Sequence, residues 1–216
     1  PYLETFNERI QMNNSPISND DLANSVTIVK KAVDDMLKEG KTHPTEFEVV
    51  TATAMVYYEK KSVDIVVLEV GMGGRLDATN VIDSPEVAII TSISNDHSEY
   101  LGDTLEKIAF EKASIIKPGC DVVIYPQKKS VFEVIKNYAN EKSATLHSVD
   151  TNDINIVSFG PLGQRLMYLN ILTNTGIRDF ELNLLGSHQS VNCLTVLKTI
   201  EILIGKGYKI DSDHIR

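Results

Sequence analysis

The sequence predicts an α/β fold: a doubly wound, mostly parallel sheet with helices on both faces and an appended antiparallel β meander. Apolar runs alternate with segments of helical periodicity over residues 20–149, which is typical of βα units. The run from Val63 to Leu68 is apolar at consecutive rather than alternating positions, as in a strand covered on both faces. Over 154–184 short apolar runs are separated by turn residues, which favours a meander.

The expected elements follow one another without internal repeats. Helices are expected at about 20–39, 46–60, 103–116, 130–141 and 187–206, and strands at 63–68, 87–93, 121–125 and 145–149. Gly40 is typical of a helix stop, and Thr45 with Glu48 forms a T-x-x-E capping box. Ser130 and Ser190 are expected as N-caps of the last two helices.

The predicted organisation is a truncated central domain over 1–216. It comprises an α/β core over 1–150, the meander over 151–185 and a closing helix over 186–216. With 216 residues, of which 42% are hydrophobic, the chain is long enough to bury a substantial core.

Composition excludes several classes of partner. The net charge of -9 argues against a nucleic-acid surface, and no apolar run approaches the length of a membrane span, so we expect no membrane association. The two cysteines, Cys120 and Cys193, lie far apart and form neither a disulfide framework nor a zinc motif. A reducing cytosol is therefore the expected compartment.

A carboxylate and an imidazole follow two successive predicted strands. Glu69 comes directly after residues 63–68 and before a glycine-rich turn, and His97 follows residues 87–93. Ligands of open α/β sheets bind outside the carboxyl ends of the strands, so we expect both side chains at one edge of the sheet. Each alone could be a solvated or structural side chain; together they indicate a site.

Lys112 falls three and four residues after Ala109 and Ile108, on the apolar stripe of the predicted helix over 103–116. Burying an ammonium group is costly unless it is paired or modified, so an inward lysine should have a partner or a modification. The alternative is a side chain that extends past the apolar face to solvent.

Two further polar residues each allow two interpretations. Glu48 has sufficient reason to be present as the second member of the capping box. Asn192 would lie in the first turn of the last helix, near free amides that could face a ligand, although a structural polar residue fits equally well.

Several blocks carry a resemblance to a known family. They are FNERI, TEFE, LEVGMGGRLDATN, TSISNDH, GDTLEKIAFEKASIIKPG and LLGSHQSVN, in this order. In sequence and spacing they resemble the central part of folylpolyglutamate synthase and the related dihydrofolate synthase, ATP-dependent amide ligases similar to the Mur ligases. The resemblance extends over nearly the whole chain.

The resemblance implies a role for each matching position. Glu69 and His97 would be ligands of Mg²⁺, although a histidine is an unusual ligand for this hard ion. Lys112 would be carbamylated, which turns a cation into an anion, and Asn192 would contact ATP. The pterin-containing substrate would be lined by Glu46, Phe47, Glu48, Val49, Leu76, Asp77 and Ala78.

The implied reaction adds L-glutamate to a folate or to dihydropteroate through an acyl phosphate, with ATP and Mg²⁺, in a protein expected to be a monomer. No G-x-x-x-x-G-K-[ST] loop occurs in the sequence. In the family this loop precedes the segment that matches Pro1, so we expect an internal fragment that is inactive alone. The alternatives are a non-catalytic ligand-binding module of the same fold and a muramyl-peptide-type ligase.

Overall fold

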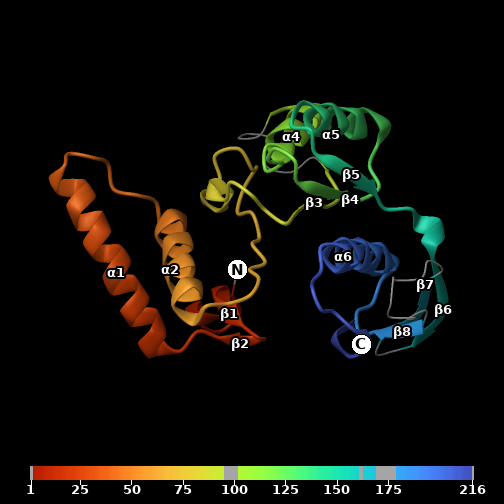
Figure 1. Cartoon of the computed structure of the whole chain (residues 1–216), viewed down its shortest axis with the longest axis horizontal. Coiled ribbons are helices and arrows are strands. Elements are labelled where there is room, and N and C mark those ends of the chain that lie inside the picture. The colour runs from red at the N-terminus through yellow and green to blue at the C-terminus, as the bar shows by residue number, and fades with distance from the viewer. Residues whose placement is uncertain (1, 95–101, 161–162, 169–178, 216) are drawn as a thin grey trace. The chain divides into compact units, whose positions relative to one another are not determined.

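The structure is a computed structural model that describes residues 2–94, 102–160, 163–168 and 179–215. The chain divides into two units, one formed by Pro1–Met72 with Asp77–Val81 and the other by Gly73–Leu76 with Ile82–Arg216 (Figure 1). The predicted division at residues 150 and 185 stays a prediction. Within the described residues, no helix combines the length and apolar character needed to cross a membrane.

The first unit consists of two helices beside a small hairpin. Its elements are η1 (Phe6–Arg9), β1 (Gln11–Met12), β2 (Ser15–Pro16), α1 (Asn19–Lys38), α2 (Glu46–Lys61) and η2 (Ala78–Val81). β1 and β2 pair antiparallel across Asn13 and Asn14, whose φ angles of 51° and 62° are those of a tight hairpin turn. Ile10, Ile17 and Tyr57 form the buried core of this unit.

The two predicted helices of this unit are confirmed, together with the predicted glycine stop of α1 and the predicted capping box of α2. Ser18 caps α1 by accepting a hydrogen bond from the Asp21 amide, and Gly40 ends the helix with a φ of 77°. Thr45 and Glu48 form the predicted capping box of α2, with Glu48 Oε2 2.6 Å from the Thr45 amide nitrogen.

The strand predicted over 63–68 is wrong. Residues 63–70 have no regular secondary structure, and the exposed fractions of Ile65, Val66 and Val67 are 47%, 37% and 89%. A strand is completed by hydrogen bonds to neighbouring strands, and no described strand pairs with this segment. The apolar composition therefore identified a strand-like sequence that has no pairing partner in the described part of the chain.

The second unit contains the parallel sheet. Its elements are β3 (Val87–Ile90), α4 (Leu105–Ala113), β4 (Asp121–Ile124), α5 (Lys129–Glu141), β5 (Thr145–Ser148), η3 (Thr151–Asp153), β6 (Ile154–Gly160), β7 (Gly163–Tyr168), β8 (Asp179–Leu182), α6 (Ser187–Gly205) and α7 (Ser212–Ile215). The sheet has the order β3-β4-β5 with all pairs parallel, and β6, β7 and β8 form an antiparallel sheet. The predicted α/β fold with a meander is confirmed.

Alternate residues of β4 face two different cores. Val122 and Ile124 pack with Ala109 of α4 and Ile135 of α5 on one face of the sheet. Val123 packs on the other face, against α6 and the meander, in a core that includes Leu166, Leu194 and Leu197. Helices therefore cover both faces of the parallel sheet, as predicted (Figure 1).

Two of the predicted N-caps are wrong. α5 begins after Lys128 without a side-chain cap, so Ser130 lies inside the helix instead of at the cap position. α6 begins after Gly186, so Ser190 lies inside the helix, where its Oγ donates to the carbonyl of Ser187. In both helices the serine that the sequence suggests as a cap lies within the helix.

A charged cluster connects the start of β4 to the end of α6. Lys206 Nζ lies 3.1 Å from Asp121 Oδ2 and 3.3 Å from Glu86 Oε2, and His147 Nε2 lies 2.7 Å from Asp121 Oδ1. Burial raises the pKa of the Asp121 carboxyl, but the hydrogen bonds from His147 and Lys206 outweigh it and leave the pKa below its ordinary value.

Both cysteines are free thiols in the second unit. Cys120 is buried directly before β4, and Cys193 is half-buried in α6. Burial raises the pKa of both thiols, that of Cys193 to about 11.

Candidate active site

The glycine-rich segment comprises residues 68–80, LEVGMGGRLDATN. Its first half packs against the start of α2 at Gly71. A Cβ at Gly71 would lie 2.6 Å from the ring of Phe47 and 3.1 Å from Asp77 Oδ2, so a larger residue there would require the Phe47 ring to move. Phe47 and Asp77, both predicted to line the substrate, therefore meet at this glycine.

Asp77 organises the turn around it. Its Oδ2 accepts hydrogen bonds from the amides of Gly71 and Met72, each at 2.9 Å. Its Oδ1 accepts from the amide and hydroxyl of Thr79 at 2.9 and 2.6 Å. Because both carboxylate oxygens are engaged, Asp77 shapes the loop; sequence reasoning missed this role, although Asp in a glycine-rich turn is a known signal for it.

The second half of the segment packs on α4. A Cβ at Gly74 would lie 2.5 Å from the carbonyl oxygen of Glu111 and 3.3 Å from Lys112 Cα. Arg75 Nε lies 3.1 Å from Glu111 Oε1. The structure thus brings together two blocks that the sequence separates, LEVGMGGRLDATN and EKASIIKPG.

Lys112 lies at this contact with a half-buried side chain on α4. It forms no ion pair with any other residue in the described ranges. A half-buried lysine without an ion-pair partner among the described residues is compatible with carbamylation of its amine, which stays a prediction.

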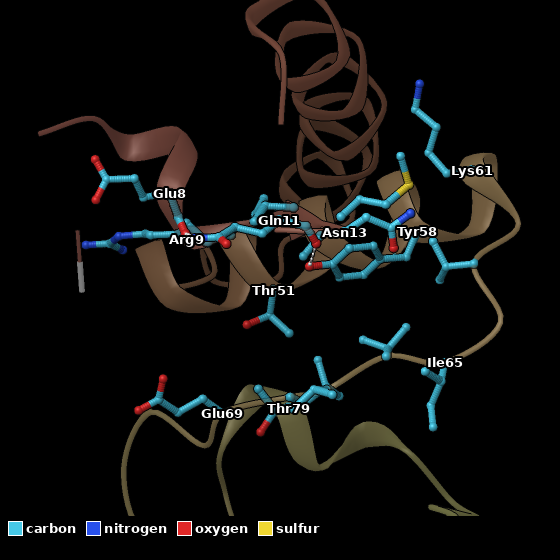
Figure 2. Close-up of a pocket in the computed structure, with 18 of the residues that line it drawn as sticks. Glu8, Arg9, Gln11, Asn13, Thr51, Tyr58, Lys61, Ile65, Glu69 and Thr79 are labelled. Carbon is cyan, nitrogen blue, oxygen red and sulfur yellow. Dashed lines mark hydrogen bonds between the residues drawn. The ribbon is translucent and has the colours of Figure 1, made fainter. Parts of the chain in front are cut away.

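Glu69 lies at the edge of an open cleft of about 910 Å³ in the first unit. Figure 2 shows Glu69, Thr79 and Ile65 on one side of this cleft and Thr51 and Tyr58 of α2 on the other. Glu69 is exposed and has no hydrogen-bond or ion-pair partner among the residues that the structure describes. A free, accessible carboxylate suits a hard cation such as Mg²⁺.

The other predicted substrate residues lie near the start of α2 and around the loop. Glu48 is engaged in the capping box, and the hydrogen bond from the Thr45 amide lowers the pKa of its carboxyl. Glu46 Oε1 lies 3.5 Å from Arg9 Nη1, and the Leu76 side chain is 84% exposed. Val49 follows Glu48 in α2, and Ala78 opens η2. Contact of these residues with substrate stays a prediction.

Asn192 is placed differently from the prediction. Because α6 begins at Ser187, Asn192 lies in the second turn rather than the first. Its side chain is exposed, and its Nδ2 donates to Gln189 Oε1 at 3.0 Å. A role in binding ATP stays a prediction.

The predicted placement of Glu69 and His97 at one edge of the sheet stays a prediction. His97 lies outside the described residues, and Glu69 and Lys112 belong to different units. Within the described part of the chain, no three His, Cys, Asp or Glu side chains form a group that could hold a metal ion.

Comparison with known proteins identifies the family to which the chain belongs. The Mur ligase middle domain matches residues 17–200, so the chain belongs to this family. Within the family it is similar to the dihydrofolate synthase/folylpolyglutamate synthase of Bacillus subtilis, with 37% identity over 205 residues that are 94% of this chain and 47% of the relative.

Solved structures give the same result. The folylpolyglutamate synthase of Thermotoga maritima matches all of this chain with a TM-score of 0.87 and 35% identity, over 48% of its own length. A complex of a folylpolyglutamate synthase with AMPPCP and folate matches with a TM-score of 0.89 and 30% identity, over 52% of its length. The chain spans about half the length of the relatives it matches.

Proposed function

We propose that this chain is the central part of an ATP-dependent ligase that adds L-glutamate to a folate, to dihydropteroate or to both. The observation that carries the proposal is the contact of the glycine-rich block with α4 at Gly74, which joins the two most specific sequence blocks. The similarity to folylpolyglutamate synthases over the whole chain supports it.

The proposed chemistry activates a poor acyl donor. A carboxylate oxygen of the pteroate or folate attacks the γ-phosphorus of ATP and releases ADP. The amine of glutamate then attacks the acyl carbon, loses a proton and expels inorganic phosphate, which forms the amide. Bound Mg²⁺ would neutralise phosphate charge during the transfer.

The proposal assigns a role to each of the predicted site residues. Glu69, exposed and unpaired among the described residues, would hold the cation together with His97. Lys112, once carbamylated, would carry a negative charge at the contact with the glycine-rich block. Phe47 and Asp77 shape the wall that would face the pterin, and Asn192 would contact ATP.

Isotope transfer tests the reaction. With ¹⁸O in the substrate carboxylate, the full-length protein should release ADP and phosphate that carries the label, because one carboxylate oxygen leaves with the phosphate. Release of AMP, or unlabelled phosphate accompanying amide formation, would contradict the proposal. The 216-residue chain alone should show no turnover.

The same experiment distinguishes the non-catalytic alternative. A binding module of this fold would bind a pterin ligand without forming the amide even as the full-length protein. The cytosolic location and the monomeric state are also proposals, which fractionation and sedimentation would test.

A further inference from the structure

Gln164 is a buried amide in the middle strand of the meander. It lies in β7, paired with Phe159 of β6 and Leu182 of β8, and is only 3% exposed. Its Nε2 donates hydrogen bonds to the carbonyls of Leu184 and Gly186 at 3.1 and 3.2 Å. One side chain therefore bonds to two carbonyls of the four-residue connection between β8 and α6.

The orientation of this amide follows from its partners. Both groups facing the NH₂ are carbonyl acceptors, so the flipped amide would place three oxygens together. In the orientation observed, Oε1 is buried and has no hydrogen-bond partner among the described residues. An unpaired buried acceptor destabilises the fold, whereas an apolar side chain of similar length would avoid this loss. The two donated bonds are therefore the property that distinguishes glutamine at this position.

These bonds fix the start of α6. Gly186, the N-cap, has a φ of 110°, and its carbonyl also accepts from the Gln189 amide at 3.0 Å. A Cβ at Gly186 would lie 2.6 Å from the ring of His188, so the turn is closely packed. The side chain of Gln189 in turn accepts from Asn192. A continuous series of contacts thus leads from Gln164 to Asn192.

We propose that Gln164 is a positioning residue that fixes the first turns of α6 and thereby the orientation of Asn192 toward the adenine nucleotide. The part concerning the nucleotide rests on the proposed function. Gln164 touches no reacting group in this scheme; it acts through the Gly186 carbonyl and the Gln189 amide.

The first test measures the turn itself in the 216-residue chain. Gln164→Met keeps the side-chain length but removes both donors and the unpaired acceptor. Amide hydrogen exchange at Gln189 should become about tenfold faster or more. Leu166→Met, a conservative change at a fully buried residue of the same strand, is the matched control and should leave this exchange within about twofold. Equal exchange in wild type and Gln164→Met would overturn the proposal.

The second test measures nucleotide recognition in the full-length protein. Gln164→Met should raise the KM for ATP about tenfold and leave the KM values for folate and glutamate within about twofold, a split that general loss of structure does not produce. A parallel rise in all three KM values would overturn the positioning role. A wild-type protein without ATP-dependent glutamate addition would refute the proposed function and the nucleotide part of this inference, while the exchange experiment still decides whether Gln164 holds the turn.

Discussion

Two apolar runs of nearly the same composition differ in secondary structure and in burial: one forms a buried strand and the other forms no strand. Residues 121–124, with the sequence DVVI, form β4, and Val122, Val123 and Ile124 are at most 1% exposed. Residues 63–68, with the sequence VDIVVL, form no strand, and Val67 is 89% exposed. β4 has a parallel neighbour on each side and a core on each face. Apolar side chains therefore indicate where a strand can be buried, but neighbouring backbone decides whether it forms.

The largest expected effect comes from placing the same charge in both runs. Val123→Asp should lower the free energy of unfolding of the second unit by about 4 kcal/mol or more, because a carboxylate would enter a dry core. Val67→Asp should change stability by less than about 0.5 kcal/mol, because this side chain is already in water. Urea denaturation followed by circular dichroism measures both. Equal losses in the two variants would contradict the comparison.

The packing of the glycine-rich block on α4 gives the next effect. Gly74→Ala should destabilise the second unit by about 2–3 kcal/mol, because the added methyl group meets a backbone oxygen that cannot move aside easily. Gly205→Ala is the matched control, because nothing lies within 4 Å of its Cβ and alanine favours the helix. Thermal unfolding compares the variants, and a Gly74→Ala protein as stable as the control would contradict the close packing.

The charged cluster that anchors β4 should respond to pH. The pKa of Asp121 is below its ordinary value of 3.8 in the folded protein. Its ionised form therefore contributes stability that is present above about pH 4 and is lost as the pH falls through the lower folded pKa. Asp121→Asn should cost about 1–2 kcal/mol at pH 6, since the ion pair with Lys206 is lost.

Urea midpoints between pH 2 and pH 6 measure this contribution. The loss caused by Asp121→Asn should shrink toward the acid end, where the wild-type carboxyl becomes protonated. The other titratable groups of the cluster are Glu86, His147 and Lys206, which remain in both proteins. A loss that stays constant over this range would assign the effect to packing instead of charge.

The smallest effect concerns the helix that precedes the exposed run. Thr45→Ala should destabilise α2 by about 1 kcal/mol, because the Glu48 amide loses its cap. Glu46→Gln, which removes only an exposed ion pair of 3.5 Å with Arg9, should change little. Amide exchange in the first turn of α2 measures both, and equal protection in Thr45→Ala and wild type would show that the box contributes nothing.

Sequence reasoning succeeded where the determinants are local. The capping box of α2, the glycine stop of α1 and the apolar stripe of α4 are all read within a few residues, and all are present. It failed where the local structure depends on residues that are distant in the sequence. Ser130 looks like a cap, but α5 already begins after Lys128. The run at 63–68 needs neighbouring strands that no pattern within it can supply.

The candidate site likewise contains features that the sequence predicted and features that depend on distant partners. The blocks around Gly71 and Gly74 were recognised as motifs, but their packing against Phe47 and α4 depends on the fold and could not be predicted from spacing. Gln164 carried no signal at all, because an isolated glutamine in a strand resembles any exposed polar residue. Only its burial and its two carbonyl partners reveal it.

The buried thiol of Cys120 has a practical consequence. Alkylating reagents attack the thiolate, and burial keeps this sulfur both protonated and shielded directly before β4. Its labelling rate should therefore report how often the centre of the parallel sheet opens, without any engineered probe. Labelling the native protein with a thiol-reactive reagent and following the modification of Cys120 over time would measure this opening rate.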